Sequence, residues 1–219
     1  MRIVSGISLA AVLLGAAVQT AAAQSELGPD RWYWGGQGGV LMWKTPTQAK
    51  TRGAPFAGVN WFITKRQVAL SLGFDQFFFP SYASTSITNA SSATGATTVA
   101  FDRAQRFSAM LYAMPGHGLL RLDLGIGFAI NNITNAQPTG TGSQAELDAA
   151  TQSVKSLRTA AMFQAAVGVH YVMGRGMLYG EYRFNPGSDN YLIPIEQHTI
   201  AGGIRYAFSS SRTEVTTEQ

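Results

Sequence analysis

The sequence predicts an all-β protein, an eight-stranded antiparallel up-and-down transmembrane β-barrel. Three observations predict it: an N-terminal secretion signal, eight segments in which apolar and polar side chains alternate, and connections that are alternately short and long. Only 13% of the 219 residues are charged, and cysteine is absent. This composition excludes a highly charged disordered chain, a disulfide-stapled domain and any site built on thiolates.

The N-terminal segment has the features of a cleaved signal peptide. Arg2 precedes an apolar run, Ile7–Val18, and small residues follow at Ala21–Ala23, so we expect cleavage after Ala23. The apolar run is too short to cross a bilayer as a helix. The expected organisation is a signal peptide over 1–23, an outer-membrane barrel domain over 24–208 and a polar periplasmic tail over 209–219.

Eight segments show the period-two alternation of two-faced strands and are bounded by turn residues. They are Arg31–Lys44, Gly53–Ile63, Gln67–Phe79, Thr98–Met114, Leu119–Ile130, Arg158–Met173, Met177–Phe184 and His198–Phe208. Alternation is strictest in the fifth segment, where leucines, isoleucines and Phe128 occupy the even positions and Arg121 and Asp123 the odd ones. Such a run is too long to arise from a helical period.

The connections supply the evidence for an even-stranded barrel. Tight turns rich in Gly or Pro, or only three residues long, join strands two and three, four and five, and six and seven. The longer connections between them are Thr45–Arg52, Pro80–Thr97, Asn131–Leu157 and Asn185–Gln197. Short periplasmic turns that alternate with long extracellular loops are typical of outer-membrane barrels.

The polar face of the strands indicates which side is inward. A soluble barrel would carry many Lys and Glu on its wet face, whereas the chain has four lysines, all in expected loops, turns or strand ends. The polar face instead carries small residues and a few opposite charges, which suits a narrow packed lumen. We therefore predict a structural network of lumen charges, formed by Asp75, Arg106, Arg121, Asp123, Glu181, Arg183 and Arg205.

Aromatic residues gather near the ends of the expected strands, as in the headgroup-level girdles of membrane barrels. The periplasmic girdle would include Trp32, Tyr33, Trp34, Trp61, Phe62, Tyr112, Tyr171, Tyr206 and Phe208. The extracellular girdle would include Trp43, Phe77, Phe78, Phe79, Tyr82, Phe128 and Phe184. The alternative explanation is the general enrichment of aromatic residues in strands.

Two of the long loops differ in character. Pro80–Thr97 is rich in Ser, Thr, Ala and Asn and predicts a mobile loop with nothing to form a core. Ser143–Leu157 instead combines a capping box, Ser143 with Glu146, with apolar residues at helical spacing. We expect a short helix there, resting on the barrel rim.

The signal peptide, the eight strands and the closing segment Gly202–Phe208 resemble the OmpA-like outer-membrane β-barrel family. Members of that family end the last strand on a Phe, with another aromatic two residues earlier, and the barrel-assembly machinery reads both. Tyr206 and Phe208 occupy these positions, so the resemblance implies that they form the assembly signal. The family's Phe is commonly the final residue, whereas Ser209–Gln219 follows here.

The sequence favours a structural or surface-interaction protein of the bacterial outer membrane rather than an enzyme. The three histidines, His117, His170 and His198, lie in no catalytic pattern, because a lipid A deacylase would place a serine two residues from a histidine and His198 lacks one. No metal-ligand spacing or phosphate loop is present, so no cofactor is expected.

The expected partners follow from this location. They are outer-membrane lipid, lipopolysaccharide and, during biogenesis, the barrel-assembly machinery, for a chain that acts as a monomer. Nucleic acid is not expected, because the formal net charge is only +4 and the basic residues are not clustered. The alternatives are a narrow small-solute channel and a lipid-modifying outer-membrane enzyme.

Overall fold

The computed structural model describes residues 31–46, 48–89, 95–115, 118–139 and 143–210. The predicted signal peptide, His117 and residues 211–219 of the predicted tail lie outside the described residues. The strands within this part of the chain are β1 (Arg31–Thr45), β2 (Gln48–Lys65), β3 (Val68–Phe78), β4 (Ser84–Thr88), β5 (Ala96–Ala113), β6 (Leu120–Thr139), β7 (Thr159–Met173), β8 (Gly176–Asn185) and β9 (Gln197–Ser210), with one helix, α2 (Gln144–Leu157).

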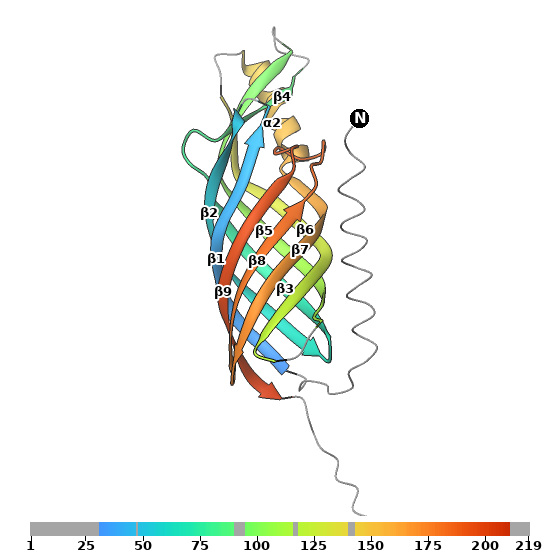
Figure 1. The fold of residues 1–219 in the computed structure, drawn as a ribbon. Coiled ribbons are helices and arrows are strands. Elements are labelled where there is room, and N and C mark those ends of the chain that lie inside the picture. The colour runs from blue at the N-terminus through green and yellow to red at the C-terminus, as the bar shows by residue number, and fades with distance from the viewer. Residues whose placement is uncertain (1–30, 47, 90–94, 116–117, 140–142, 211–219) are drawn as a thin grey trace, which may run out of the picture.

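Eight of these strands close into an antiparallel up-and-down barrel, which confirms the predicted fold class (Figure 1). Consecutive barrel strands are neighbours, and β1 closes the barrel by pairing with β9, as Gly38 with Gly202. β3 pairs directly with β5, so β4 stands outside the ring of eight. No helix in the described part of the chain is long and apolar enough to cross a membrane.

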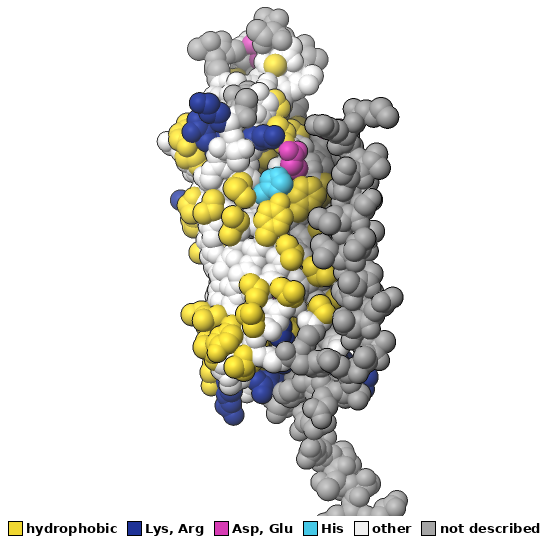
Figure 2. Space-filling model, viewed as in Figure 1, with side chains coloured by type: hydrophobic (Ala, Val, Ile, Leu, Met, Phe, Trp, Pro, Cys, Tyr) yellow, Lys and Arg dark blue, Asp and Glu magenta, His cyan; other side chains and the backbone are white. Residues whose placement is uncertain are grey.

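The barrel wall is apolar on the outside and mixed on the inside. Its largest exposed side chains include Leu111, Leu122, Ile126, Phe128 and Ile204, each at least 60% exposed. Figure 2 shows apolar side chains over the wall and Lys and Arg near its two ends. Exposure of a continuous apolar belt of this extent to water would be unfavourable, whereas the acyl chains of a membrane would cover it.

Three strands run beyond the predicted barrel and build a sheet on the side of the long loops. β6 continues nine residues past Ile130, and β4 lies inside the predicted mobile loop Pro80–Thr97, paired with the start of β5. The expectation of an unstructured loop was therefore wrong for Ser84–Thr88. Thr85, Ile87 and Val99 are buried and alternate with exposed or half-buried residues, so this hairpin does have apolar contacts.

The predicted rim helix is present as α2. The side chain of Ser143 accepts the Glu146 N–H at 3.4 Å, and the Glu146 carboxylate accepts the Ser143 N–H at 2.6 Å, which confirms the capping box. Ala150 and Val154 are its buried residues and join the apolar cluster beneath the sheet. The helix therefore belongs to the structured end of the barrel that carries the long loops.

Two apolar clusters fill the ends of the lumen. The upper cluster, on the side of the long loops, joins Trp43, Phe56, Phe77 and Phe79 to α2 and the β8–β9 loop. The lower cluster, on the side of the short turns, joins residues such as Tyr33, Phe62 and Tyr112. Trp43, Phe77, Phe79, Tyr33, Phe62 and Tyr112 are all at most 7% exposed, so their assignment to the lipid-facing girdles was wrong. Each of these residues lies at a position of its strand that faces the lumen, and large rings pack tightly in a narrow lumen.

Candidate functional site

A layer of charged and polar side chains lies between the two apolar clusters. In β1, Gln37 falls between Tyr33 of the lower cluster and Leu41 of the upper one, and the other barrel strands also contribute polar side chains to the lumen. Three acids and three arginines are buried here, each at most 4% exposed: Asp75, Asp123, Glu181, Arg106, Arg183 and Arg205. Their formal charges balance, as buried charges require.

Arg183 is the centre of this layer. Its guanidinium donates to the Glu181 carboxylate, to Asp75 Oδ2 at 3.2 Å and to Gln37 Oε1 at 3.1 Å. Glu181 also accepts the Tyr112 hydroxyl at 2.7 Å, and Asp75 also accepts the Gln37 amide. Both carboxylates are therefore paired and hydrogen-bonded, which is the condition under which buried ions are tolerated.

The other two arginines bind neutral groups instead of acids. Arg205 donates to Asn60 Oδ1 at 2.8 Å, and its guanidinium carbon lies 4.0 Å and 3.7 Å from the ring centroids of Phe62 and Tyr179. Glycine at position 35 leaves room for it, because a Cβ there would meet Arg205 Cγ at 2.7 Å. Cation–π contact and a shared hydrogen-bond network thus hold a charge that has no direct acid partner.

Arg106 spans the top of the layer. It donates to Asn131 Oδ1 at 2.8 Å, to Thr199 Oγ1 at 3.1 Å and to Gln197 Oε1 at 3.3 Å. Its guanidinium carbon also lies 4.6 Å from the Phe77 ring centroid. These bonds tie β5 to β6 and, across the lumen, to β9.

The remaining two residues of the predicted network make no direct contact with its other charged members. Asp123 contacts His170 Nδ1 at 3.3 Å, with both side chains buried, so its partner is a histidine rather than an arginine. Arg121 is half-buried at the lower mouth, where its Nε donates to the Gly118 carbonyl at 3.0 Å. The prediction that Arg121 lies on the inward face of its strand was correct. However, Arg121 lies at the opening of the barrel, where it contacts no other charged residue of the predicted network.

Sequence reasoning missed the neutral members of the layer. Gln37 and Asn60 bond to each other at 3.0 Å, and the Tyr179 hydroxyl donates to Gln37 at 2.6 Å. Their inward parity was visible in the sequence, but only charged residues were singled out. Among the described residues, buried polar atoms without a hydrogen-bond partner include His170 Nε2, Arg205 Nη2 and Asn131 Nδ2.

The end of the lumen on the side of the long loops is covered by a cap. We use this name for α2, the β4–β5 hairpin and the β8–β9 loop. Tyr191, Leu192 and Ile193 of that loop are at most 4% exposed, and the Leu192 N–H donates to the Leu157 carbonyl at 3.0 Å. Burial raises the pKa of the Tyr191 phenol, against the opposing effect of Arg106, so Tyr191 remains neutral inside the cap.

The outer wall carries a second group of polar residues near the extracellular rim. Tyr182 Oη lies 2.5 Å from His198 Nδ1, and Lys44 pairs with Glu196 at 3.4 Å. A bond from its own backbone N–H and the Lys44 ammonium hold the pKa of the Glu196 carboxyl below its usual value, against the effect of partial burial. Within the described residues no serine joins His198, and no group of three His, Asp or Glu side chains could hold a metal.

The predicted assembly signal lies on the outside of β9. Tyr206 is 47% and Phe208 67% exposed, and their ring centroids are 5.5 Å apart. β9 continues two residues further than predicted, because Ser209 and Ser210 pair with Trp32 and Arg31 of β1. The last strand therefore ends at Ser210 rather than at Phe208.

Comparisons with known proteins give the fold but no family. No family model matches the chain, and no curated protein does. Among solved structures, the chain resembles Neisserial surface protein A, with a TM-score of 0.55 and 14% identity over 83% of this chain and 99% of that one. The chain thus has the fold of the small eight-stranded outer-membrane β-barrels.

Two further structures align with lower scores. The attachment invasion locus protein of Yersinia pestis, solved with the heparin analogue sucrose octasulfate, gives a TM-score of 0.45 and 9% identity over 84% of this chain and all of that one. The outer membrane protein OprG of Pseudomonas aeruginosa gives a TM-score of 0.41 and 8% identity over 82% of this chain and 95% of that one.

Proposed function

We propose that the protein is a plugged barrel of the bacterial outer membrane that acts through its extracellular cap. The observation that carries this proposal is the filling of the lumen at three levels: the upper apolar cluster, the charged layer and the lower apolar cluster. A barrel closed in this way has no continuous aqueous path, so its exposed surfaces are what remains for interaction. The cap is a structured surface outside the apolar belt.

The membrane location is supported by the wall itself. The belt of exposed large apolar side chains is uninterrupted by charge. Lys50, Arg52 and Lys65 lie near the ends of β2, and Arg103 lies on β5 beyond Phe107, the last large outward apolar residue of that strand. Lipid-facing charge near the midplane would cost about 2–4 kcal/mol. We include in the proposal secretion by the predicted signal peptide, membership of the OmpA-like family and assembly through Tyr206 and Phe208.

Lipopolysaccharide and phospholipid are the proposed partners of the outer wall, and the chain is proposed to act as a monomer. The Lys44–Glu196 pair and the His198–Tyr182 contact lie where β1 and β8 end and β9 begins, at the end of the wall where a lipid headgroup would meet them. We favour this lipid-contact role over a catalytic one, because the ionised Glu196 and the Tyr182-bonded His198 have no adjacent nucleophile among the described residues. A channel is the second alternative, and the experiment below tests it.

Planar-bilayer recording tests the proposal directly. The protein refolded into a bilayer should give no steady single-channel current, whereas a porin inserted in the same bilayer as a positive control should conduct. Large and stable conductance steps from the wild-type protein would contradict the plugged barrel and favour the channel. Outer-membrane fractionation with heat-modifiable gel mobility verifies in parallel that the sample is a folded barrel.

A further inference from the structure

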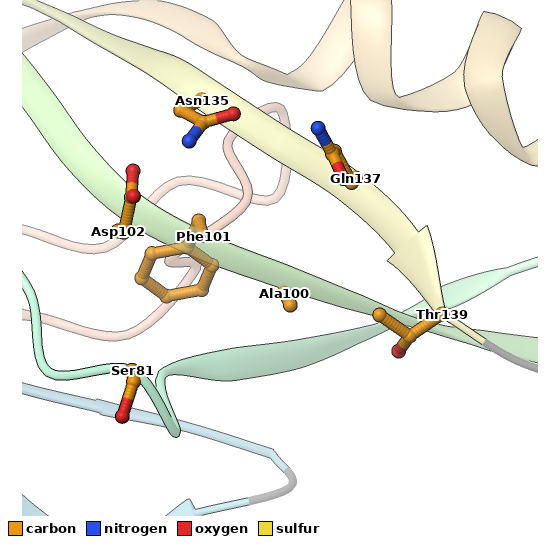
Figure 3. Close-up of a pocket in the computed structure, with 7 residues that line it drawn as sticks. All are labelled: Ser81, Ala100, Phe101, Asp102, Asn135, Gln137 and Thr139. Carbon is orange, nitrogen blue, oxygen red and sulfur yellow. The ribbon is translucent and has the colours of Figure 1, made fainter.

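A polar cavity lies beside the cap, where β5 and β6 leave the barrel wall. Its volume is about 260 Å³, and it is lined by Ser81, Ala100, Phe101, Asp102, Asn135, Gln137 and Thr139 (Figure 3). Asn135 and Gln137 project from one strand and Asp102 from the next, while Ser81 comes from the turn after β3. The cavity is separate from the lumen layer and from the contact between His198 and Tyr182.

The cavity is shaped by an irregularity in the sheet. The pairing of β5 with β6 skips Asp102 on one strand and Thr134 on the other. Backbone bonds hold the bulge in place, because the Phe79 N–H donates to the Asp102 carbonyl at 2.7 Å and the Phe101 N–H to the Ala83 carbonyl at 3.0 Å. Bulges of this kind redirect a side chain and are frequent beside binding sites.

Asp102 is the unusual member of the lining. Its Oδ1 atom has no access to solvent and no hydrogen-bond partner in the described structure. The side chains of Ser81, Asn135 and Gln137 likewise make no hydrogen bond to another described residue. Buried carboxylate oxygens are normally satisfied, so this acceptor would gain a partner if a water or the hydroxyl of a ligand entered the site.

We propose that this cavity binds a neutral sugar unit. A carboxylate accepts two hydroxyl groups, carboxamides both donate and accept, and the hydroxyls of Ser81 and Thr139 complete a set suited to a polyol. Phe101 and Ala100 supply the apolar part of the lining. An anionic ligand would be repelled by Asp102, and a hard cation would require more oxygen ligands with charge than a single carboxylate provides.

The position of the cavity agrees with this ligand. Along β5 the outward side chains are Leu111, 62% exposed, and Phe107, 53% exposed, followed by exposed Arg103 next to the cavity. The cavity therefore lies just beyond the apolar belt, at the depth of lipid headgroups. The sugar would come either from a lipopolysaccharide headgroup or from a free glycan. This inference rests on the proposed function only because it requires the capped end of the barrel to face the outside of the cell.

Saturation-transfer NMR on the full chain in a sugar-free detergent tests the site. The probes are D-glucose, D-galactose, D-mannose and N-acetyl-D-glucosamine, with D-glucose 6-phosphate as the anionic comparison. We expect transfer to at least one neutral sugar and a weaker signal for the phosphate. Asp102→Ala and Asn135→Ala should each weaken binding about tenfold, the usual effect of losing hydrogen bonds to a charged or well-placed group. Asp148→Ala on the exposed face of α2 is the matched control and should bind as the wild type does.

A second arm distinguishes the two sources of sugar. The same variants are tested for binding of purified lipopolysaccharide in vesicles, with phosphatidylcholine vesicles as the blank. Binding in this arm alone, lost in Asp102→Ala, identifies the headgroup as the source. No binding in either arm, or equal binding by Asp102→Ala with normal heat-modifiable mobility, overturns the proposal. A silent bilayer recording with no sugar binding would leave the plugged barrel standing and reject only the sugar site.

Discussion

Glu181 accepts hydrogen bonds from both Arg183 and Tyr112 in the charged layer. Glu181→Gln keeps the shape but removes the charge opposite Arg183, which then depends on Asp75 alone for neutralisation. We expect the free energy of unfolding to fall by about 3 kcal/mol, because removing one partner strands the other in the protein interior. Thermal unfolding in detergent, followed by heat-modifiable mobility, measures this loss.

The control for this substitution is Lys50→Gln. Lys50 is exposed on β2, where a solvated charge contributes little, so its melting point should stay within error of the wild type. An unchanged melting point for Glu181→Gln would show that the charged layer does not stabilise the barrel. Whether the network is structural, as the sequence predicts, is decided by this comparison.

Trp43 offers a second test at the scale of single residues. It is 1% exposed and packs edge-on against Phe79 and Phe101, with ring centroids 5.3 Å and 5.5 Å away. In a variant that keeps Trp43 as its only tryptophan, brominated acyl chains should barely quench its fluorescence. A variant that keeps only Trp34, which is 52% exposed on the wall, should be strongly quenched. Equal quenching of both would place Trp43 in the girdle after all.

At the scale of elements, α2 depends on its capping box. Ser143→Ala removes the acceptor for the Glu146 N–H and should cost the helix about 1 kcal/mol. Hydrogen exchange in the first turn of α2 should then quicken about fivefold, with no change in the melting point of the barrel. Ser156→Ala, at the other end of α2, is the control. Unchanged exchange in Ser143→Ala would mean that tertiary contacts alone hold the helix.

The end of β9 carries the assembly prediction. Phe208→Ala should lower the amount of folded protein in the outer membrane several-fold, if the outward aromatic is read during insertion. Phe128→Ala is a matched control, because Phe128 is an outward phenylalanine with the same 67% exposure on another strand. Deletion of residues 211–219 should have less effect than Phe208→Ala, since the deletion leaves β9 and its described pairing with β1 up to Ser210 in place. Loss of assembly in the deletion alone would reject Phe208 as the signal.

At the scale of the whole molecule, we predict that closure of the lumen does not depend on α2. Replacing Gln144–Leu157 by a short Gly-Ser linker removes α2 but leaves the charged layer and the lower apolar cluster in place. We therefore expect no steady conductance from this variant in planar bilayers. Stable current steps would show that α2 is the plug and that the charged layer passes ions.

The sequence by itself determined the number of barrel strands, their order and the inward parity of every charge in the lumen layer. These features depend on a local period of two residues and on short turns, which are visible in any single segment. The same alternation also predicts that Trp43 and Phe77 point inward. Trp43 lies an even number of residues from the inward-facing Gln37, and Phe77 lies two residues from the inward-facing Asp75. Proximity to a strand end had suggested a girdle instead.

Only the packing of distant strands determines how deep each side chain lies in the lumen and which residues it contacts. How far a residue lies along the lumen depends on the stagger of strands distant in sequence, so Arg121 falls at the mouth while Asp123, two residues on, reaches His170. The bulges at Asp102 and Thr134 shift the alternation of inward and outward side chains by one residue. A fixed period of two residues cannot predict such a shift. β4 is a strand because it pairs with β5, a contact that lies outside its own five residues.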